Sequence, residues 1–462
     1  MKRVKITVIL MMLCLTLVVC AVSISGCNKT DPNTIIVAVV RDQSSAGAQK
    51  AQEKCLEEYA RAFTLHNPDL QVQYEYLNVL PAKTDGYDCI LASGDDVLRY
   101  IAGDLVDLTQ YMKKNDVDEA QLLPSALDIG RFADKNGEKY AIYYMPFNYD
   151  RTVIYADTSL FAQACVEVPS INGWTYSEFL ETLEQLYYST NNIRYTGIYM
   201  PYYMPYVWQY YCNMFGGGWN NGKSITMDTG ETYNALLRML DVYNSGLARS
   251  YQIDQKGSAT AVCAMSMTYA CMPWHDGVTN ETLELTRANP GKNTEALLEA
   301  GTLKLLPLPA GDDGKVTGNA NTGFIKGFSV LKSSEKKATA AAFALFSVSD
   351  IGQKILNDYY GGIPVKKALW EQDFWKKGLL AGDNAKAVLY GIDYDVRDDF
   401  VQVLDGDADV YNKNIRLRTI FSALMQRDFG ESNDSERAFK IYIKDFCLEA
   451  EMTIDGLSAS VS

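Results

Sequence analysis

The sequence predicts an α/β protein whose mixed, mostly parallel β-sheets carry flanking helices. Residues 35–40 form a continuous apolar run, which is typical of a strand buried on both faces. Residues 70–76 alternate between apolar and polar side chains like a half-buried strand, and residues 89–92 form another short apolar strand. A helical pattern separates the first two strands and stops at Pro68. The order strand, helix, strand, strand indicates βαβ units and a largely parallel sheet.

Polar residues follow two of these strands and are the first candidates for ligand binding. Asp42 comes shortly after the first strand, and Asp95 comes shortly after the third. In open sheets of this kind, ligands bind beyond the carboxyl ends of the strands. Carboxylates accept hydrogen bonds from hydroxyl groups strongly because they are charged. The alternative, that both are solvated loop acids, stays open from the sequence.

Two further helices are expected. At the first, Thr175 can cap the helix while Glu178 reaches back to it, and Trp174 and Phe179 can pack as a hydrophobic staple. The alanine-rich segment 333–359 predicts a second, single helix that ends at a glycine pair.

The first residues predict an exported protein. Three basic residues precede an apolar run over residues 6–22, and small residues lead to Cys27, so residues 1–26 are predicted to be a signal peptide. Ser-Gly before Cys27 is similar to a bacterial lipobox, which implies cleavage before Cys27 and a lipid on its sulfur. Residues 27–33 then form a lipidated tether that holds the protein to the membrane, facing outside the cytoplasm. The alternative is an uncut signal anchor.

Composition excludes several classes of function. Loss of the three basic leader residues takes the net charge from −14 to −17, which disfavours nucleic acid and anionic membrane surfaces as partners, and mildly disfavours a highly anionic ligand. The length predicts two or more lobes.

Seven cysteines follow Cys27 without a C-x-x-C pair, so they are interpreted as small core residues. Cys263, Cys271 and His275 fit no common zinc spacing, so we expect neither a metal nor a cofactor.

Residues 217–224 spell G-x-x-x-x-G-K-S, the pattern of a phosphate-binding nucleotide loop. Such a loop requires a preceding strand and a following helix, but here an aromatic segment precedes the pattern and residues 225–228 alternate like a strand. Asn221-Gly222 is a strong hairpin signal, and a helix start comes only near residues 229–231. We therefore predict a hairpin in which Lys223 has no role in nucleotide binding.

Several short motifs resemble, in order and spacing, the extracellular solute-binding proteins of ABC importers, in family 1, which includes the maltodextrin binder. The motifs are residues 87–95 (YDCILASGD), 103–108 (GDLVDL), 137–142 (GEKYAI) with Pro146, 153–155 (VIY), 173–175 (GWT) with Glu178-Phe179, Ala264-Met265, 306–311 (LPLPAG) and 361–365 (GGIPV). The resemblance covers nearly the whole mature chain.

This resemblance implies a type II periplasmic-binding-protein fold, in which two α/β lobes enclose a ligand cleft. The first lobe would comprise residues 34–147 and 322–370, and the second residues 148–321 and 371–462, including C-terminal helices. Hinge crossings are expected near residues 146–151, near 319–327 and after about 367. Such proteins bind a small molecule and deliver it to ABC permease subunits in the membrane. The resemblance therefore implies a monomeric binding protein and no enzyme.

Aromatic residues are the main candidates for lining the cleft. Sugar rings present apolar faces and a rim of hydroxyls, so a sugar site needs flat aromatic side chains and a few polar groups. The aromatic-rich segment 199–219 supplies Tyr206, which matches a Pro-Tyr of the family, together with Trp208 and Trp219. After Ala264-Met265, either Trp274 or Tyr269 matches a family tryptophan that stacks on sugar. Most rings in such segments are core residues, and that alternative stays open.

Polar candidates complete the predicted site. Asp95 matches a sugar-bonding acid of the family, and Asn148 or Asp150 adds a polar group near the first crossing. Ala92 stands where the maltodextrin binder has a tryptophan, which leaves the identity of the sugar open. The predicted ligand is a carbohydrate, specifically an oligosaccharide.

Two other functions compete with this prediction. A surface glycoside hydrolase would use paired carboxylates, but no pair stands out among the 57 acidic residues. The only histidines, His66 and His275, give poor support for a catalytic triad. The adjacent tyrosines Tyr202-Tyr203 and Tyr210-Tyr211 resemble those of ferric-binding relatives, in which phenolates bind iron.

Overall fold

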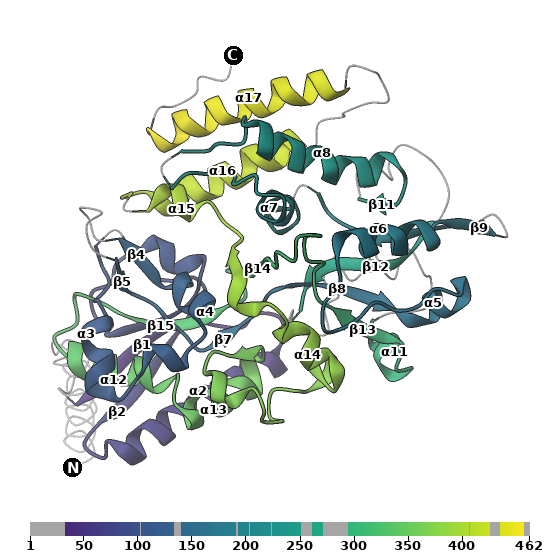
Figure 1. Ribbon diagram of the computed structural model, residues 1–462. Helices are drawn as coiled ribbons and strands as arrows, with labels where there is room; N and C mark the ends of the chain where they lie inside the picture. Colours follow the sequence, from purple (N-terminus) through teal and green to yellow (C-terminus); the bar gives the residue numbers. More distant parts are fainter. Residues whose placement is uncertain are drawn as a thin grey trace, which may run out of the picture.

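Two β-sheets with surrounding helices form the protein (Figure 1). The computed structural model describes residues 33–101, 103–133, 140–190, 193–202, 204–222, 224–250, 261–270, 294–405, 407–425 and 435–456. The expectations for the signal peptide, Cys27, Tyr203, Lys223, Cys271, Trp274 and His275 lie outside the described residues.

The first sheet carries the strands predicted from the start of the chain. Its order is β2 (Gln71–Leu77), β1 (Thr34–Val40), β3 (Cys89–Ser93), β15 (Lys326–Val330) and β6 (Met145–Pro146). β1 runs parallel to β2 and β3, whereas β15 runs antiparallel to β3 and β6. β3 is buried along its whole length, and β2 at the edge alternates between exposed and half-buried residues, as predicted. The sheet is therefore mixed.

Helices cover this first sheet. The main ones are α2 (Ala46–His66), α12 (Lys337–Phe346) and α13 (Asp350–Tyr360), with the shorter elements α3 (Thr109–Met112), α4 (Pro124–Ile129) and the hairpin of β4 (Arg131–Ala133) and β5 (Tyr140–Ile142) nearby. The prediction of one helix over residues 333–359 was wrong. The Ser349 side chain accepts a hydrogen bond from the Gly352 N–H and starts α13 as a separate helix. A serine that satisfies a free backbone donor in this way favours a new helix start over continuation.

The second sheet is also mixed. Its order is β11 (Ala248–Arg249), β10 (Ile193–Tyr199), β12 (Ala261–Tyr269), β8 (Thr152–Asp157) and β13 (Leu303–Leu306), with β9 (Tyr188–Thr190) paired to β10. β10 is parallel to β11 and β12, while β8 is antiparallel to both β12 and β13.

The helices of this second part include α5 (Thr158–Ala164), α6 (Tyr176–Gln185), α7 (Pro205–Met214), α8 (Gly230–Asn244), α11 (Thr294–Glu299), α14 (Asp383–Leu389) and the C-terminal α15 (Val401–Leu404), α16 (Val410–Met425) and α17 (Ser435–Ile454). The predicted capping box at Thr175 and Glu178 is present, and the rings of Trp174 and Phe179 lie 5.6 Å apart. Both local predictions are confirmed.

The glycine-rich stretch before α8 forms a turn, as predicted. Asn220 and Ile225 pair as an antiparallel bridge, and the Asn221 N–H donates to the Ser224 carbonyl at 3.2 Å. The helix after the turn begins only at Gly230, with Thr229 as its cap. The element before the pattern is α7, a helix, so the strand that a phosphate loop needs is missing at this place.

Short paired strands connect the two sheets. β7 (Asn148–Tyr149) lies between β6 and β8 and pairs with β16 (Ile363–Pro364), and β14 (Gly318–Ala320) pairs with β17 (Asp395–Arg397). Figure 1 shows β7 and β14 between the two main bodies of the molecule. A buried ion pair joins two of these crossings, since Arg151 Nη2 lies 2.6 Å from Asp395 Oδ1. The crossing segments thus form a hydrogen-bonded hinge.

No helix among the described residues is long and apolar enough to span a membrane. The six cysteines of the described residues are free, and all except Cys165 are buried. This agrees with their interpretation as small core residues.

Candidate ligand-binding cleft

An ion pair joins the two lobes at the predicted residue Asp95. Asp95 follows β3 of the first sheet, and its Oδ2 and Oδ1 lie 3.3 and 3.4 Å from Nη1 and Nη2 of Arg418 on α16. Arg418 Nη2 also lies 3.7 Å from Asp398 Oδ1. One guanidinium thus binds an acid from the first lobe and an acid next to the hinge strand β17.

Thr322 connects the same two acids. Its hydroxyl lies 2.7 Å from Asp95 Oδ1 and 2.7 Å from Asp398 Oδ1, although one hydroxyl proton can be donated to only one of them. Burial raises the pKa of Asp398, and the nearby Arg418 opposes that shift. Burial alone would lower the pKa of Arg418, but Asp95 and Asp398 outweigh it and raise the pKa. Arg418 therefore stays charged and balances the acids.

Two predicted tyrosines join this cluster. The Tyr269 hydroxyl donates to Asp398 Oδ2 at 2.6 Å, and its ring centroid lies 4.6 Å from that of Tyr206. Tyr206 lies at the start of α7 and is fully buried, while Tyr269 is 8 % exposed. Asp95, Tyr206 and Tyr269, which were selected from the sequence, are thus linked in space. We name the set Asp95, Tyr206, Tyr269, Thr322, Asp398 and Arg418 the cleft cluster.

Half of the cleft cluster was missed at the sequence level. Thr322, Asp398 and Arg418 lie far along the chain from Asp95 and match no short motif. One signal was present on α16, where Tyr411, Ile415 and Arg418 recur at helical spacing on one face.

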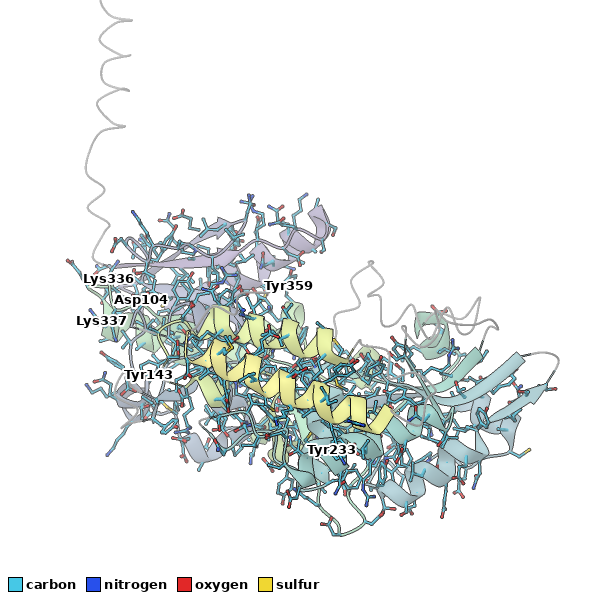
Figure 2. All side chains as sticks on the ribbon, turned by 90° about the horizontal axis from the view of Figure 1, so that it is seen from above. Asp104, Tyr143, Tyr233, Lys336, Lys337 and Tyr359 are labelled. Atoms are coloured by element: carbon cyan, nitrogen blue, oxygen red, sulfur yellow. The ribbon has the colours of Figure 1, made fainter. Side chains whose placement is uncertain are left out.

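A second interlobe contact lies beside the cleft cluster. The guanidinium of Arg99, in the short helix Asp96–Arg99, lies 4.1 Å from the ring centroid of Tyr411 on α16 and donates to the Tyr411 hydroxyl. A cavity of about 330 Å³ opens between these contacts. Figure 2 shows the two C-terminal helices, drawn in yellow shades, lying across the middle of the molecule. Helix α16 therefore contacts the first lobe.

The predicted tryptophans occupy a different environment. Trp208 is fully buried, and its ring lies 4.1 Å from Phe421, 5.6 Å from Trp219 and 5.7 Å from Phe400. Trp219 is 2 % exposed. Both rings pack against the C-terminal part of the second lobe, so neither can stack on a ligand in this conformation.

Asn148 and Asp150 lie in the hinge. The Asn148 side chain accepts a hydrogen bond from the Lys326 N–H at 2.7 Å and donates to the Gly361 carbonyl at 3.2 Å. Asp150 accepts from Asn321 Nδ2 at 2.7 Å. In this conformation both side chains tie neighbouring crossing segments together.

Asp42 lies away from the cleft cluster. Its carboxylate accepts hydrogen bonds from Ser44 and from the Tyr359 hydroxyl. It lines a separate cavity of about 310 Å³ in the first lobe, beyond the ends of β1 and β3. The sequence correctly predicted that Asp42 follows the end of a strand, and the cavity beside it can accommodate a ligand.

The tyrosine pair Tyr210-Tyr211 does not form a site for ferric iron here. Tyr210 donates to the Pro309 carbonyl at 2.6 Å, and burial raises the pKa of both hydroxyls. A raised pKa disfavours the phenolate that would bind iron. The described residues also hold no group of three or more His, Cys, Asp or Glu side chains that could bind a metal ion.

Two α/β lobes that meet across a hinge, with polar and aromatic side chains between them, define a two-lobe solute-binding protein. The chain belongs to the bacterial extracellular solute-binding proteins, since the model of that family matches residues 68–381. Members of this family are binding proteins rather than enzymes and act outside the cytoplasm.

Solved structures support the same fold. An ABC substrate-binding protein from Listeria monocytogenes, in complex with cycloalternan, is 19 % identical, with a TM-score of 0.59 over 93 % of this chain and 100 % of that one. The GacH receptor of Streptomyces glaucescens, studied with acarbose, is 17 % identical, with a TM-score of 0.58 over 92 % of this chain and 99 % of that one. The cyclic alpha-maltosyl-1,6-maltose binding protein of Arthrobacter globiformis is 11 % identical, with a TM-score of 0.62 over 92 % and 100 % of the two chains. No curated protein matches by sequence.

Proposed function

We propose that this protein is the lipid-anchored binding component of an ABC importer, which captures an oligosaccharide between its lobes and delivers it to the permease. The cleft cluster carries this proposal. It combines charged hydrogen-bonding groups from both lobes with the adjacent rings of Tyr206 and Tyr269. Fixed polar groups beside aromatic faces suit the hydroxyl rim and apolar face of a sugar.

The geometry also suggests how capture favours closure. Asp95 belongs to the first lobe, whereas Tyr269 and Arg418 belong to the second, so a sugar held among them would contact both lobes. A ligand that contacts both lobes binds the closed state better and shifts the population toward it. Because Tyr206 is fully buried here, a conformational change must expose its ring before it can meet a ligand.

The proposed ligand-binding set keeps all residues selected from the sequence, with different support. Asp95, Tyr206 and Tyr269 have direct support from the cleft cluster, and Asp42 has support from its cavity. Asn148, Asp150, Trp208, Trp219 and Trp274 remain predictions from the sequence, because the first four are engaged in the hinge or the core in this conformation and Trp274 lies outside the described residues.

Other parts of the proposal rest on other observations. The lipid anchor rests on the basic leader, its apolar run and the Ser-Gly-Cys27 motif. The permease partner follows from the family. The carbohydrate ligand is supported by fold neighbours that were solved with cycloalternan or acarbose. We further propose a monomer with lobes 34–147 plus 322–370 and 148–321 plus 371–462.

A thermal-shift screen of the mature protein against mono- and oligosaccharides tests the function. A ligand that binds only the folded state stabilises it by about 2.7 kcal/mol at one hundred times its Kd. We expect at least one oligosaccharide to raise Tm, and we expect Tyr269→Ala to weaken that shift. Tyr394→Ala is the matched control, because Tyr394 is 65 % exposed.

Three results would reject the proposal. The absence of any shift in Tm across the panel would reject a carbohydrate as the ligand. Turnover of a labelled glycan would indicate a glycoside hydrolase instead. A charge-transfer colour on addition of ferric iron would indicate a metal-binding protein.

A further inference from the structure

The cavity beside Asp42 adjoins the interlobe cavity. It lies beyond the carboxyl ends of β1 and β3 and has a volume of about 310 Å³. The two cavities share Ser93, Asp96 and Gly323 in their walls. The two cavities are therefore neighbours, and a chain-like ligand that occupied both would reach from the cleft into the first lobe. We name this space the end cavity.

Two cations in the wall of the end cavity have unused hydrogen-bond donors. The Lys326 ammonium makes one hydrogen bond, to the Gly323 carbonyl at 3.3 Å, although it carries three N–H groups. Arg41 Nε is buried and has no hydrogen-bond partner among the described residues. Within the same part of the chain, neither side chain forms an ion pair.

The acids of the end cavity are already engaged. Asp42 accepts hydrogen bonds from Ser44 and from the Tyr359 hydroxyl. Asp96 accepts one from Ser93 Oγ at 2.8 Å and pairs with Arg99 at 3.6 Å. The unused hydrogen-bond donors identified in the end cavity are therefore those of the two cations.

Burial adds a reason for an anion at this place. It lowers the pKa of Lys326, against the opposing effect of Asp96 and Asp95. An anionic group on the ligand would pair with this ammonium and favour its charged form. Three carboxylates, Asp42, Asp95 and Asp96, lie near, so a monoanion is tolerated better than a phosphate dianion.

The remaining walls leave room for a ring. Ala92 offers only a methyl group, while Phe324 and Tyr360 offer aromatic surface. This combination of apolar wall and hydrogen-bond donors is typical of a pocket for one small polar unit.

We propose, resting on the carbohydrate function above, that the end cavity binds the terminal unit of an acidic oligosaccharide and that Lys326 and Arg41 donate hydrogen bonds to its carboxylate. The ligand class is therefore a saccharide that ends in a uronic acid. Charged partners make such hydrogen bonds stronger than those between neutral groups.

Calorimetry on the mature protein tests this proposal with matched probes. The panel pairs uronate-terminated di- and trisaccharides with their neutral counterparts, which differ only by CH₂OH in place of the carboxylate. We expect at least one acidic member to bind about tenfold or more tightly than its counterpart, a preference worth about 1.4 kcal/mol. The preference should shrink at high salt, because salt screens the charge interaction.

Variants separate charge recognition from a structural role. Lys326→Met and Arg41→Met should each reduce the acidic-to-neutral affinity ratio about tenfold while leaving the neutral probe little changed. Lys50→Met and Arg61→Met are the controls, since both side chains are exposed on α2. A lost ratio with retained neutral binding cannot arise from misfolding.

Each outcome decides between the proposals. If no acidic probe binds better than its counterpart but neutral probes bind, the end-cavity proposal fails and the carbohydrate function stands. Equal loss for both probes in the variants also overturns it. Tighter binding of a sugar phosphate would reject the carboxylate assignment. If no saccharide binds at all, both proposals fail.

Discussion

Replacing Arg418 should open the ligand-free protein. Arg418 bridges Asp95 of the first lobe and Asp398 beside the hinge, at 3.3 and 3.7 Å. Arg418→Met keeps much of the apolar side-chain bulk but removes the charge that joins the lobes. Asp95 and Asp398 would then face each other across Thr322 without the guanidinium that contacts both, and their repulsion favours separation.

The size of the effect follows from the burial of the partners. A hydrogen bond to a charged group contributes about 1.5–3 kcal/mol. The side chains of Arg418 and Asp95 are 28 % and 31 % exposed, so solvent screens part of their attraction, whereas Asp398 is only 5 % exposed. A net value of about 2 kcal/mol in favour of opening is therefore expected. That corresponds to about a thirtyfold fall in the closed-to-open ratio.

Small-angle scattering of the ligand-free protein measures this change. The radius of gyration should rise in Arg418→Met and remain at the wild-type value in Arg416→Met, which alters an exposed arginine on the same helix. Identical scattering from wild type and Arg418→Met would show that the ion pair has no part in holding the lobes together.

Three further predictions concern stability and anchoring. Trp208→Ala should lower the free energy of unfolding by about 3–5 kcal/mol in denaturant titrations, because the ring is fully buried against Phe421; a loss below about 1 kcal/mol would contradict a core role. Burial raises the pKa of Asp395 from 3.8 to about 6, against the opposing effect of Arg151, so the folded state holds this proton more tightly than the unfolded chain. Its stabilising contribution of up to about 3 kcal/mol is therefore present below about pH 4 and is lost as pH rises to about 6. Urea titrations over this range should show that the free energy of unfolding of Asp395→Asn lacks this dependence on pH. An unchanged pH dependence in the variant would rule out Asp395 as its source. Cys27→Ala should yield protein that needs no detergent, and intact-mass analysis of native protein without an acyl group would reject the lipid anchor.

Local signals in the sequence predicted much of the fold. The buried strand β1, the alternating strand β2 and the capping box at Thr175 depend on neighbours within a few residues, and each was found where expected. The prediction of one helix over residues 333–359 failed because Ser349 caps a new helix and so interrupts a long run of helix-favouring alanines.

The cleft cluster was only partly predictable, because its members meet through tertiary packing. The many aromatic residues of α7 correctly predicted that this segment contributes a ring to the cleft cluster, but they could not show which rings face it. Tyr206 faces Tyr269, whereas Trp208, two residues later, faces Phe421 of α16. Arg418 and Asp398 join Asp95 only after the C-terminal helices fold against the first lobe, and no local pattern encodes that contact.

A crystal structure of the mature protein with an oligosaccharide from the thermal-shift screen shows whether the cleft cluster binds the ligand. We expect sugar density between the lobes, with Asp95 bonded to hydroxyl groups that replace Arg418 and with the ring of Tyr206 or Tyr269 against a sugar face. Sugar bound on an outer surface, with the Asp95–Arg418 pair intact and the cleft cluster untouched, would contradict it.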